Sequence, residues 1–414
     1  MKYELRPYQK QASIDLNHKL RMYKIAYLHG EVRIGKTISV LETCKLYDAK
    51  KVLFVTKKKA ISSIKSDYEK FEYTFELTII NYESIHKVEL DFDLLVLDES
   101  HSIASFPKPS KQCKYIRKSF SYLPIILLTG TPAVESGSQW FHQLHVSNFS
   151  PFEENTFYQW AKKYVEVYEI NYGNGYPTKK YDKANRELIQ KVIDPYIVTI
   201  TQEDAGFTTK IKENILRCEM KPITYKIANK LLSDRVVKGK DSEILGETPV
   251  KLMSKLHQIY NGTCITEDEK TIIIDNSKAK FVKNHFKGKK IAIFYYFKAE
   301  LDLLKETYGE NITTELEEFN TTSKNIALQQ SGLEGMNLSK ADYLVYYNFA
   351  FSGKNFIQSR DRMTIKTRLE NEIYFIFEKK GINEKIYKQV KEKRSYNIKQ
   401  FNKEYSYNEA NGQD

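Results

Sequence analysis

The sequence has few cysteines and lacks any long apolar run. The four cysteines lie far apart along the chain, at Cys44, Cys113, Cys218 and Cys264. Disulfide scaffolds and zinc modules use closely spaced cysteines or neighbouring histidines, so this spacing argues against both and indicates a reduced protein. The longest apolar runs, such as residues 124–128 and 291–297, are far shorter than the ~20 residues that a membrane-spanning helix needs. The polar start after Met1 shows no export signal, so we expect a cytoplasmic protein without membrane contact.

Acidic residues are in the minority. The chain has 53 Asp and Glu residues against 65 Lys and Arg residues, which leaves a formal net charge of +12. An excess of positive charge favours a polyanionic partner such as nucleic acid. The 30 tyrosines and the abundant lysines also fit the codon bias of a low-GC genome, so charge alone leaves both explanations open.

Short β-branched runs alternate with helix-length segments in the first third of the 414-residue chain, at residues 25–28, 52–56, 77–81, 94–97 and 125–128. Strands separated by helices are typical of a parallel sheet, because a crossover helix joins neighbouring parallel strands. The same rhythm returns at residues 291–296, 326–329, 343–347 and 373–377. The sequence therefore predicts an α/β fold with two parallel-sheet lobes.

The middle of the chain is charged, rich in helix formers and interrupted by the turn-forming residues 171–177, which can close a β-hairpin. We predict a mostly helical insertion there. The end of the chain is a Lys-rich amphipathic segment that either binds duplex phosphates or is a solvated helix. The predicted boundaries are 1–150 for the first lobe, 151–270 for the insertion, 271–378 for the second lobe, and 379–414 for a basic C-terminal helix with a frayed tail.

Residues 30–37, GEVRIGKT, fit the pattern G-x-x-x-x-G-K-[ST] and lie between a predicted strand and an amphipathic helix. Gly30 and Gly35 allow backbone N–H groups to surround the phosphates of ATP. Lys36 then reaches the β and γ oxygens, and the Thr37 hydroxyl ligates Mg²⁺. A Gly-rich turn that merely opens a helix is the alternative, and the strand before the pattern argues against it.

Two carboxylates follow the apolar strand at 94–97, in the order Asp98-Glu99-Ser100-His101. Beside a phosphate loop, Asp98 is expected to hold Mg²⁺ and Glu99 to polarise the attacking water. Acids after a strand can also cap a helix, but the phosphate loop disfavours that alternative. His101 either couples the nucleotide state to the rest of the molecule or makes a supporting hydrogen bond.

The order of these motifs resembles the Snf2-like branch of superfamily 2 helicases and translocases over nearly the whole chain. Residues 5–9, LRPYQ, are similar to the opening motif of that family. The resemblance implies that the glutamine of this motif, here Gln9, recognises adenine. The alternative is that these residues only begin a helix, with Pro at its first position. Residues 98–101 resemble its D-E-x-H box. Residues 129–132, TGTP, resemble its third motif, which implies that Thr129 and Thr131 join ATP hydrolysis to movement.

The resemblance also implies where nucleic acid is bound. Thr56, Lys57 and Lys58 follow the second strand, and Asn81 follows the third, where the family contacts the backbone of a DNA strand. Basic and polar groups at strand ends suit phosphate contacts, although such residues are also typical of solvated loops. Residues 157–181 are similar to the hairpin insertion of annealing-helicase relatives.

Two further motifs are similar to those of the second lobe in this family. Residues 329–338 resemble motif V, which implies a nucleic-acid contact for Gln330 and a nucleotide contact for Gly335. Residues 358–362 resemble the start of motif VI, which implies that Arg362 stabilises the γ-phosphate and that Arg360 lies near the nucleotide. The family carries another arginine where this chain has Ile365, and the candidates to replace it are Arg360, Lys366 and Arg368.

Taken together, the resemblance implies an ATP- and Mg²⁺-dependent monomeric motor with two RecA-like lobes that moves along or remodels duplex or branched DNA. Its compactness is similar to that of phage or mobile-element members, which implies a bacterial or phage-infected host cytoplasm. The alternatives are an RNA helicase, a non-motor nucleic-acid-binding protein switched by nucleotide, and a nuclease fused to a motor. No additional acidic or histidine cluster in the sequence favours the nuclease.

Overall fold

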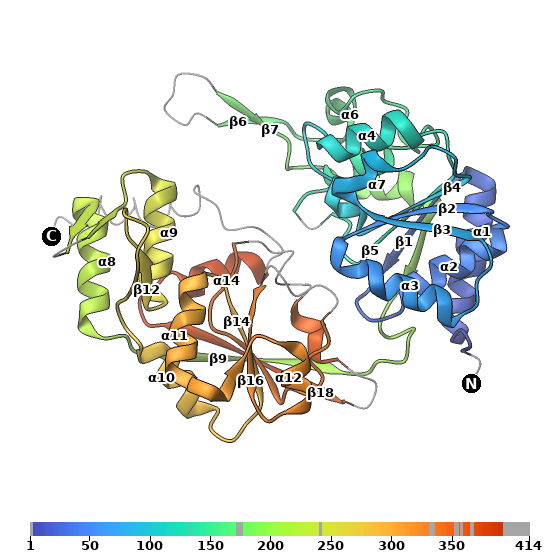
Figure 1. Ribbon diagram of the computed structural model, residues 1–414. Coiled ribbons are helices and arrows are strands. Elements are labelled where there is room, and N and C mark those ends of the chain that lie inside the picture. Colours follow the sequence, from blue (N-terminus) through green and yellow to red (C-terminus); the bar gives the residue numbers. More distant parts are fainter. Residues whose placement is uncertain are drawn as a thin grey trace. The chain divides into compact units, whose positions relative to one another are not determined.

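The chain folds into two α/β units (Figure 1). The computed structural model describes residues 3–133, 135–170, 177–239, 242–330, 336–351, 356, 359–364 and 368–391. The first unit is Met1–Phe207 and the second is Thr208–Asp414. Two parallel sheets confirm the predicted α/β fold with two RecA-like lobes.

The first unit is built on a six-stranded parallel sheet in the order β3-β2-β4-β5-β1-β8. Five strands confirm the runs predicted from the sequence: β1 (Ile25–Gly30), β2 (Lys51–Thr56), β3 (Glu76–Asn81), β4 (Leu94–Asp98) and β5 (Ile125–Thr129). The sixth strand, β8 (Ile197–Ile200), pairs with β1 and comes from the segment predicted as an insertion.

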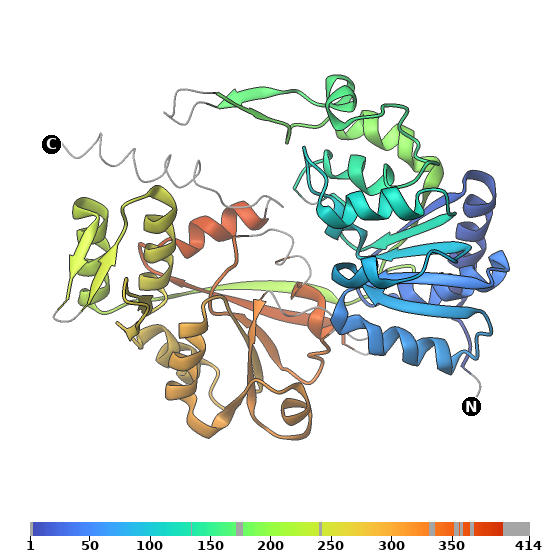
Figure 2. The same ribbon diagram turned by 45° about the horizontal axis from the view of Figure 1, so that its top comes forward.

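Helices cover both faces of the first sheet (Figure 2). They are α1 (Pro7–Tyr23), α2 (Lys36–Tyr47), α3 (Ile61–Lys70), α4 (Lys111–Phe120), α5 (Gln139–Leu144), α6 (Phe157–Tyr164) and α7 (Arg186–Ile193). Successive residues of a strand point to opposite faces, so Ala26 and Leu28 pack on the side of α1 to α3, while Ile25 and Tyr27 pack on the side of α4 to α7. Burial on both faces explains why the strands are continuous apolar runs.

The second unit contains another six-stranded parallel sheet, in the order β15-β16-β14-β17-β18-β9. Its strands are β9 (Lys210–Cys218), β14 (Ile291–Tyr295), β15 (Ile312–Thr313), β16 (Asn325–Gln329), β17 (Tyr343–Tyr346) and β18 (Glu370–Glu378). The four late runs predicted from the sequence are confirmed as β14, β16, β17 and β18.

Two layers of helices enclose this second sheet. Residues of α10 (Ser277–His285) and α11 (Lys298–Tyr308) share one apolar cluster with the sheet. The cluster on the other face includes α8 (Pro222–Asp234), α9 (Pro249–Tyr260), α12 (Leu316–Thr321) and α14 (Asn383–Lys391). Two short antiparallel pairs, β10 (Val236–Lys238) with β11 (Glu243–Leu245) and β12 (Thr263–Ile265) with β13 (Thr271–Ile273), lie beside α8 and α9.

The segment 151–270, predicted as one insertion, is divided between the two units. It supplies α6, α7 and β8 to the first unit, and β9, α8 and α9 to the second. The edge strand β9 pairs with β18 over nine residues. Charged and polar residues interrupt its sequence, KIKENILRC, so β9 lacks the continuous apolar run that marks the inner strands.

A hairpin extends from the first unit, as the turn-rich sequence predicts (Figure 2). Its strands β6 (Tyr168–Ile170) and β7 (Thr178–Lys180) pair in antiparallel register, with Tyr168 opposite Lys180. The turn residues 171–176 lie outside the described residues. Among the helices that the structure describes, none is long and apolar enough to cross a membrane.

Candidate nucleotide site

The loop between β1 and α2 forms a tight backbone cradle. Gly35 adopts φ +76°, and a Cβ atom there would lie 2.2 Å from Nε2 of Gln9. A Cβ atom at Gly30 would lie 2.6 Å from Cδ1 of Ile34, so neither position accommodates a side chain without displacement. Lys36 Nζ donates to the carbonyl oxygens of Gly30 and Glu31, each at 2.8 Å. The cradle stands at the N-terminus of α2, where the helix dipole is positive and favours phosphate.

Two neighbouring side chains of helix α1 donate hydrogen bonds to this loop. Gln9 is buried, its Oε1 accepts from the backbone N–H of Arg6 at 3.0 Å, and its Nε2 donates to the carbonyl of Ile34 at 3.3 Å. The Tyr8 hydroxyl donates to the same carbonyl at 3.0 Å. The structure thus brings Gln9 to the phosphate loop, and its recognition of adenine stays a prediction.

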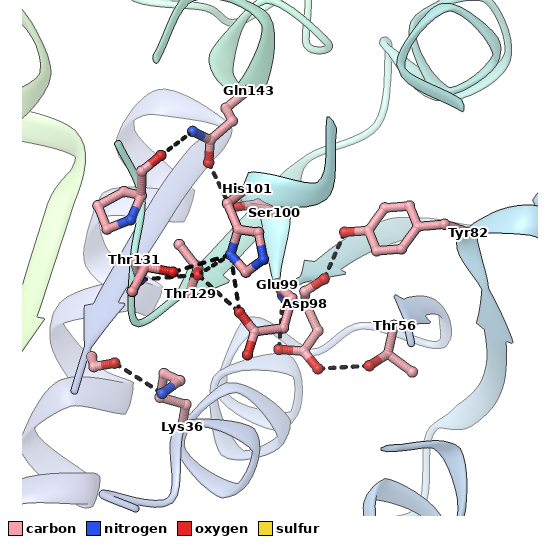
Figure 3. A network of polar contacts seen from close by, with 12 residues as sticks. Lys36, Thr56, Tyr82, Asp98, Glu99, Ser100, His101, Thr129, Thr131 and Gln143 are labelled. Atoms are coloured by element: carbon pink, nitrogen blue, oxygen red, sulfur yellow. Dashed lines mark hydrogen bonds and ion pairs between the residues drawn. The ribbon is translucent and has the colours of Figure 1, made fainter. Parts of the chain in front are cut away.

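The carboxylate of Asp98 lies at the end of β4 and has a hydrogen-bond donor on each oxygen (Figure 3). Thr56 Oγ1 donates to Oδ2 at 2.6 Å, and the backbone N–H of Glu99 donates to Oδ1 at 2.9 Å. The Tyr82 hydroxyl donates to the carbonyl oxygen of Asp98 at 2.6 Å. Burial and the neighbouring carboxylate of Glu99 raise the pKa of Asp98 to about 6.

Glu99 has a left-handed backbone with φ +49°, which is uncommon for a residue with a side chain. Its Oε2 accepts from Thr129 Oγ1 at 2.9 Å and lies 3.2 Å from His101 Nδ1. Burial acts to raise the pKa of Glu99, but the hydrogen bond and charge of His101, together with Lys36, outweigh burial and hold that pKa well below its usual range. Glu99 is therefore the carboxylate of the pair that ionises first.

Thr129 and His101 form a chain of hydrogen bonds with Glu99 (Figure 3). Because the hydroxyl proton of Thr129 is directed to Glu99, its oxygen is left to accept from His101 Nδ1 at 2.7 Å and from the backbone N–H of Thr131 at 3.2 Å. Thr131 Oγ1 lies 3.4 Å from the same Nδ1. The structure brings together all three residues to which the sequence assigns coupling.

Sheet order explains why these motifs converge. The strands β2, β4, β5 and β1 are consecutive in the sheet, and each ends at the same edge with a predicted site residue. The carboxyl ends of parallel strands share one edge, where open α/β sheets bind ligands. Thr129 on β5 consequently lies between the phosphate loop after β1 and the carboxylates after β4.

A buried glutamine joins this site although no sequence motif points to it. Gln143 on α5 accepts from Tyr27 Oη at 2.8 Å and from Ser100 Oγ at 2.9 Å. Its Nε2 donates to the carbonyls of Pro132 at 2.6 Å and Gln139 at 3.0 Å. The only sequence signal for it is weak, because Gln143 is one of three polar residues in the short helix QWFHQL.

The predicted nucleic-acid contacts lie in different environments. Thr56 is fully buried and bonded to Asp98, so it supports the carboxylate instead of facing a strand of DNA. Lys58 is exposed at the start of a 3₁₀ turn, Lys57 is partly exposed, and Asn81 donates to Glu83 at 2.8 Å. Gln330 belongs to the second unit, is buried, and accepts from the backbone N–H of Ala350.

The arginines of the second unit occupy different environments. Arg362 is 7% exposed, and its carbonyl accepts from the backbone N–H of Leu338. Arg360 Nη2 lies 2.8 Å from Glu213 Oε1, and the guanidinium sits over the ring of Phe356. Arg368 donates to the carbonyls of Ser339 and Ala341. Gly335, Ile365 and Lys366 lie outside the described residues.

Thr37 and Asp98 are the residues of this site that suit a magnesium ion. Thr37 lies in the first turn of α2, next to Lys36, and both it and Asp98 are partly exposed. Hydroxyl and carboxylate oxygens are the ligands that Mg²⁺ prefers, with water and phosphate oxygens completing its shell. Elsewhere in the described ranges, no group of three or more His, Cys, Asp and Glu side chains is arranged to hold a metal ion.

A family model described as the SNF2-related domain matches residues 31–265, which is more than half of the chain. The chain belongs to the SNF2-related family. This confirms the resemblance to Snf2-like members of superfamily 2 and supports an ATPase or translocase of that kind. The matched region begins inside the phosphate loop and contains Lys36, the two carboxylates and the coupling residues, whereas Arg360 and Arg362 lie beyond it.

Two solved structures from Sulfolobus solfataricus are similar to this SNF2-related chain. One is a SWI2/SNF2 ATPase core in complex with dsDNA, with 15% identity, a TM-score of 0.44, and coverage of 94% of this chain and 91% of that chain. The other is a SWI2/SNF2 ATPase core domain, with 15% identity, a TM-score of 0.42, and coverage of 94% and 89%. A search of curated proteins found no significant match.

Proposed function

We propose that this SNF2-related chain is a nucleic-acid-stimulated ATPase that moves along or remodels duplex or branched DNA. The observation that carries the proposal is the hydrogen-bond chain from Glu99 through Thr129 to His101, at the sheet edge that also holds the phosphate loop. A binding protein switched by nucleotide needs a phosphate loop, but it does not need an ionised carboxylate oriented beside that loop. Family membership supports the same choice.

The phosphate loop binds ATP through the backbone N–H groups of residues 30–37 and the ammonium of Lys36. Thr37 and Asp98 would hold Mg²⁺, which would offset the negative charge that develops on the transferred phosphoryl group. Asp98 must be ionised for this purpose. The hydrogen bonds from Thr56 and from the backbone of Glu99 favour the ionised form against the cost of burial.

Glu99 orients the attacking water. A carboxylate with a lowered pKa is a weak base, so Glu99 contributes more by accepting a hydrogen bond from water than by removing its proton early. Thr129 and His101 fix the direction of its Oε2. Thr129 and Thr131 then join hydrolysis to movement, because both side chains contact His101 at the end of β5.

Nucleic acid is bound through basic and polar groups that follow the neighbouring strands. Lys57, Lys58 and Asn81 lie at the ends of β2 and β3, on the same sheet edge as the site, and their charge and polarity suit phosphate contacts. From the second unit, Gln330 supplies a nucleic-acid contact and Gly335 a nucleotide contact. Arg362 supplies positive charge to the γ-phosphoryl group, with Arg360 as the alternative. We also propose that the chain works as a monomer.

The test is ATP hydrolysis measured alone and with single-stranded DNA, duplex DNA, forked DNA and RNA across a salt titration, with Lys36→Ala as the inactive control. Duplex DNA should stimulate most, and stimulation should weaken with salt because phosphate contacts release counterions. Equal or greater stimulation by RNA would favour an RNA helicase. Binding of ATP without turnover under any of these conditions would favour a nucleotide switch.

A further inference from the structure

A cavity of about 420 Å³ lies in the first unit, and none of its lining residues belongs to the nucleotide site. It is bounded by the loop before α4, by α4 and α5, and by the first residues of α6. The apolar part of its lining consists of Pro107, Cys113, Phe141 and Phe157. This volume falls in the range of sites that take a small molecule or a few side chains of a peptide.

The charged residues of this groove are all basic. Its lining includes Lys108, Lys114 and Arg117, and no aspartate or glutamate. Burial lowers the pKa of His142, whose Nε2 lies 3.0 Å from the carbonyl of Pro107, so that this imidazole stays neutral at pH 7. Arg117 is fixed by a 2.7 Å hydrogen bond from Nη1 to the carbonyl of His145, whereas Lys108 and Lys114 are exposed.

One large aromatic side chain of the lining is exposed. Tyr158 is 47% exposed and contacts the rings of Phe157 and Tyr181 edge-on, at centroid distances of 6.0 Å and 5.8 Å. Tyrosine is enriched at protein interfaces because it offers a large apolar surface together with a polar hydroxyl. The lining thus combines an exposed tyrosine with apolar and basic side chains. Such a lining suits a partner that is acidic and also carries one large apolar side chain.

We propose that this groove binds an acidic segment of a partner protein. One aromatic or large aliphatic side chain of that segment packs among Pro107, Phe141 and Phe157, and its carboxylates face Lys108 and Lys114. Complementary charge guides such an encounter, and burial of the anchor supplies most of the affinity. Helix α5 contributes Phe141 and His142 to the groove and Gln143 to the nucleotide site, so the partner would contact a helix that the site also uses.

The test is selection of a random dodecapeptide display library on the full-length protein. Selected peptides should combine acidic residues with an aromatic or leucine anchor. They should bind at least about tenfold more weakly to the double variant Lys108→Glu/Lys114→Glu, since two favourable charge contacts become repulsive. The matched control is Lys111→Glu/Lys118→Glu, which makes the same charge change on exposed residues of α4 outside the groove.

Tyr158→Ala should weaken the selected peptides as well, without changing their charge dependence. Selection of no peptide, selection of peptides without acidic residues, or equal binding to both double variants would overturn the proposal. If the Lys108/Lys114 variant instead lost duplex DNA binding, the basic rim would belong to a nucleic-acid surface and the peptide site would be wrong. Circular dichroism of each variant shows whether the fold is retained.

The hydrogen bonds of Gln143 carry a second, independent inference, which rests on the proposed ATPase function. We infer that Gln143 is a positioning residue for the D-E-S-H box and the TGTP motif. It is fully buried, its oxygen accepts from Tyr27 and Ser100, and its nitrogen donates to Pro132 and Gln139. These bonds use both acceptor and both donor positions of the amide, which fixes its orientation.

The partners of Gln143 are adjacent to the coupling residues in the chain. Ser100 lies between Glu99 and His101, and Pro132 follows Thr131. One side-chain amide therefore holds both segments that carry the hydrogen-bond chain on Glu99. Small displacements of a reacting group lower rates steeply, so loss of this amide should affect the chemical step more than ATP binding.

The test compares Gln143→Leu and Gln143→Glu with Gln139→Ala on the same helix. Gln143→Leu should lower kcat by about tenfold or more with KM for ATP nearly unchanged. Gln143→Glu retains an acceptor for Tyr27 and Ser100 but loses donation to Pro132, so its kcat should be intermediate. Gln139→Ala should retain the parental kcat, because its side chain does not contact the motifs.

A raised KM with normal kcat in Gln143→Leu, or equal loss of kcat in Gln139→Ala, would contradict the positioning role. If the parent protein hydrolyses ATP and Gln143→Leu matches its kcat, the positioning role alone is wrong. If the parent does not hydrolyse ATP under any condition, the proposed function is wrong. Fluorescence titration with a labelled ATP analogue measures binding separately in each variant.

Discussion

At the scale of single residues, the site depends on two adjacent carboxylates that ionise differently. Desolvation of Asp98 and the neighbouring charge of Glu99 raise the pKa of Asp98 to about 6, whereas His101 and Lys36 hold the pKa of Glu99 well below its usual range. When two neighbouring acids have different pKa values because of their environments, they commonly take different chemical roles in a site. We therefore propose that Asp98 binds the metal ion and that Glu99 orients the attacking water.

Lys36→Ala should abolish ATP turnover and leave the fold intact, because it removes a phosphate-binding cation from a partly exposed position. Glu99→Gln should also stop turnover but retain ATP, since the phosphate loop is unchanged. Turnover assays and titration with a labelled ATP analogue separate the two variants. Parental turnover in Glu99→Gln would show that this carboxylate has a different role.

Asp98→Asn should stabilise the protein at neutral pH while it abolishes turnover. An ordinary aspartate has a pKa of about 4, so the native protein, with its pKa of about 6 at Asp98, binds a proton that the unfolded chain has released. Ionisation of Asp98 therefore destabilises the native state as pH rises from about 4 to 6. Asparagine cannot ionise, and the Thr56 hydroxyl can rotate to meet its amide.

The measurement is thermal unfolding of parent and Asp98→Asn across this pH range. The variant should have the higher Tm above about pH 6, and the difference should disappear below about pH 4. Asp15→Asn on α1, outside the site, is the control and should follow the parent. A constant difference at all pH values would mean that packing, and not ionisation, distinguishes the variant.

At the scale of helices and strands, the second unit is held together by a buried ion pair. Lys278 of α10 and Glu378 at the end of β18 have fully buried side chains, with Nζ and Oε2 3.4 Å apart. Asn261 Oδ1 accepts from Lys278 at 2.6 Å, and the Asn383 amide donates to Glu378 at 2.8 Å. These contacts connect α9, α10, β18 and α14 at one point.

Lys278→Met should lower the free energy of unfolding by about 3–5 kcal/mol, because it leaves Glu378 charged and buried without its cation. The double variant Lys278→Met/Glu378→Gln should recover part of this loss, since the uncompensated charge is gone. Denaturant unfolding measures both, with Lys280→Met on the exposed side of α10 as the control. A double variant less stable than the single one would contradict the electrostatic explanation.

At the scale of the whole molecule, the proposed motor needs groups from both units. The first unit carries the phosphate loop, the carboxylates and the coupling residues, while the motif VI arginines belong to the second. Arg362 is nearly buried, and Arg360 is bonded to Glu213 of β9.

Arg362→Ala should lower kcat by about 10³-fold or more, as loss of an arginine finger does in other phosphoryl-transfer systems, with ATP binding little changed. Arg360→Ala should have a small effect, because that guanidinium is held by Glu213. Steady-state ATPase assays with duplex DNA provide the comparison, and Tm values show whether either change unfolds the second unit. The reverse result would transfer the role to Arg360.

The sequence by itself determined five of the six strands of the first sheet and the chemical groups that follow them. Buried parallel strands are continuous apolar runs, and the residues after them, Gly30 to Thr37, Asp98, Glu99 and Thr129, form patterns of fixed spacing. Such local signals need no knowledge of distant contacts. The same holds for the hairpin around residues 171–177, whose turn-forming residues predicted the pairing of β6 with β7.

Only the tertiary structure decided which distant residues support that chemistry. Thr56, Tyr82 and Gln143 reach the site because strand order places β2 and the segment after β3 beside β4, and α5 against the same sheet. Neither the strand β9 nor the ion pair Lys278–Glu378 could be predicted from the sequence, since each depends on partners more than 90 residues away along the chain. Burial and pairing of polar groups are properties of the packed chain, and local sequence carries no record of them.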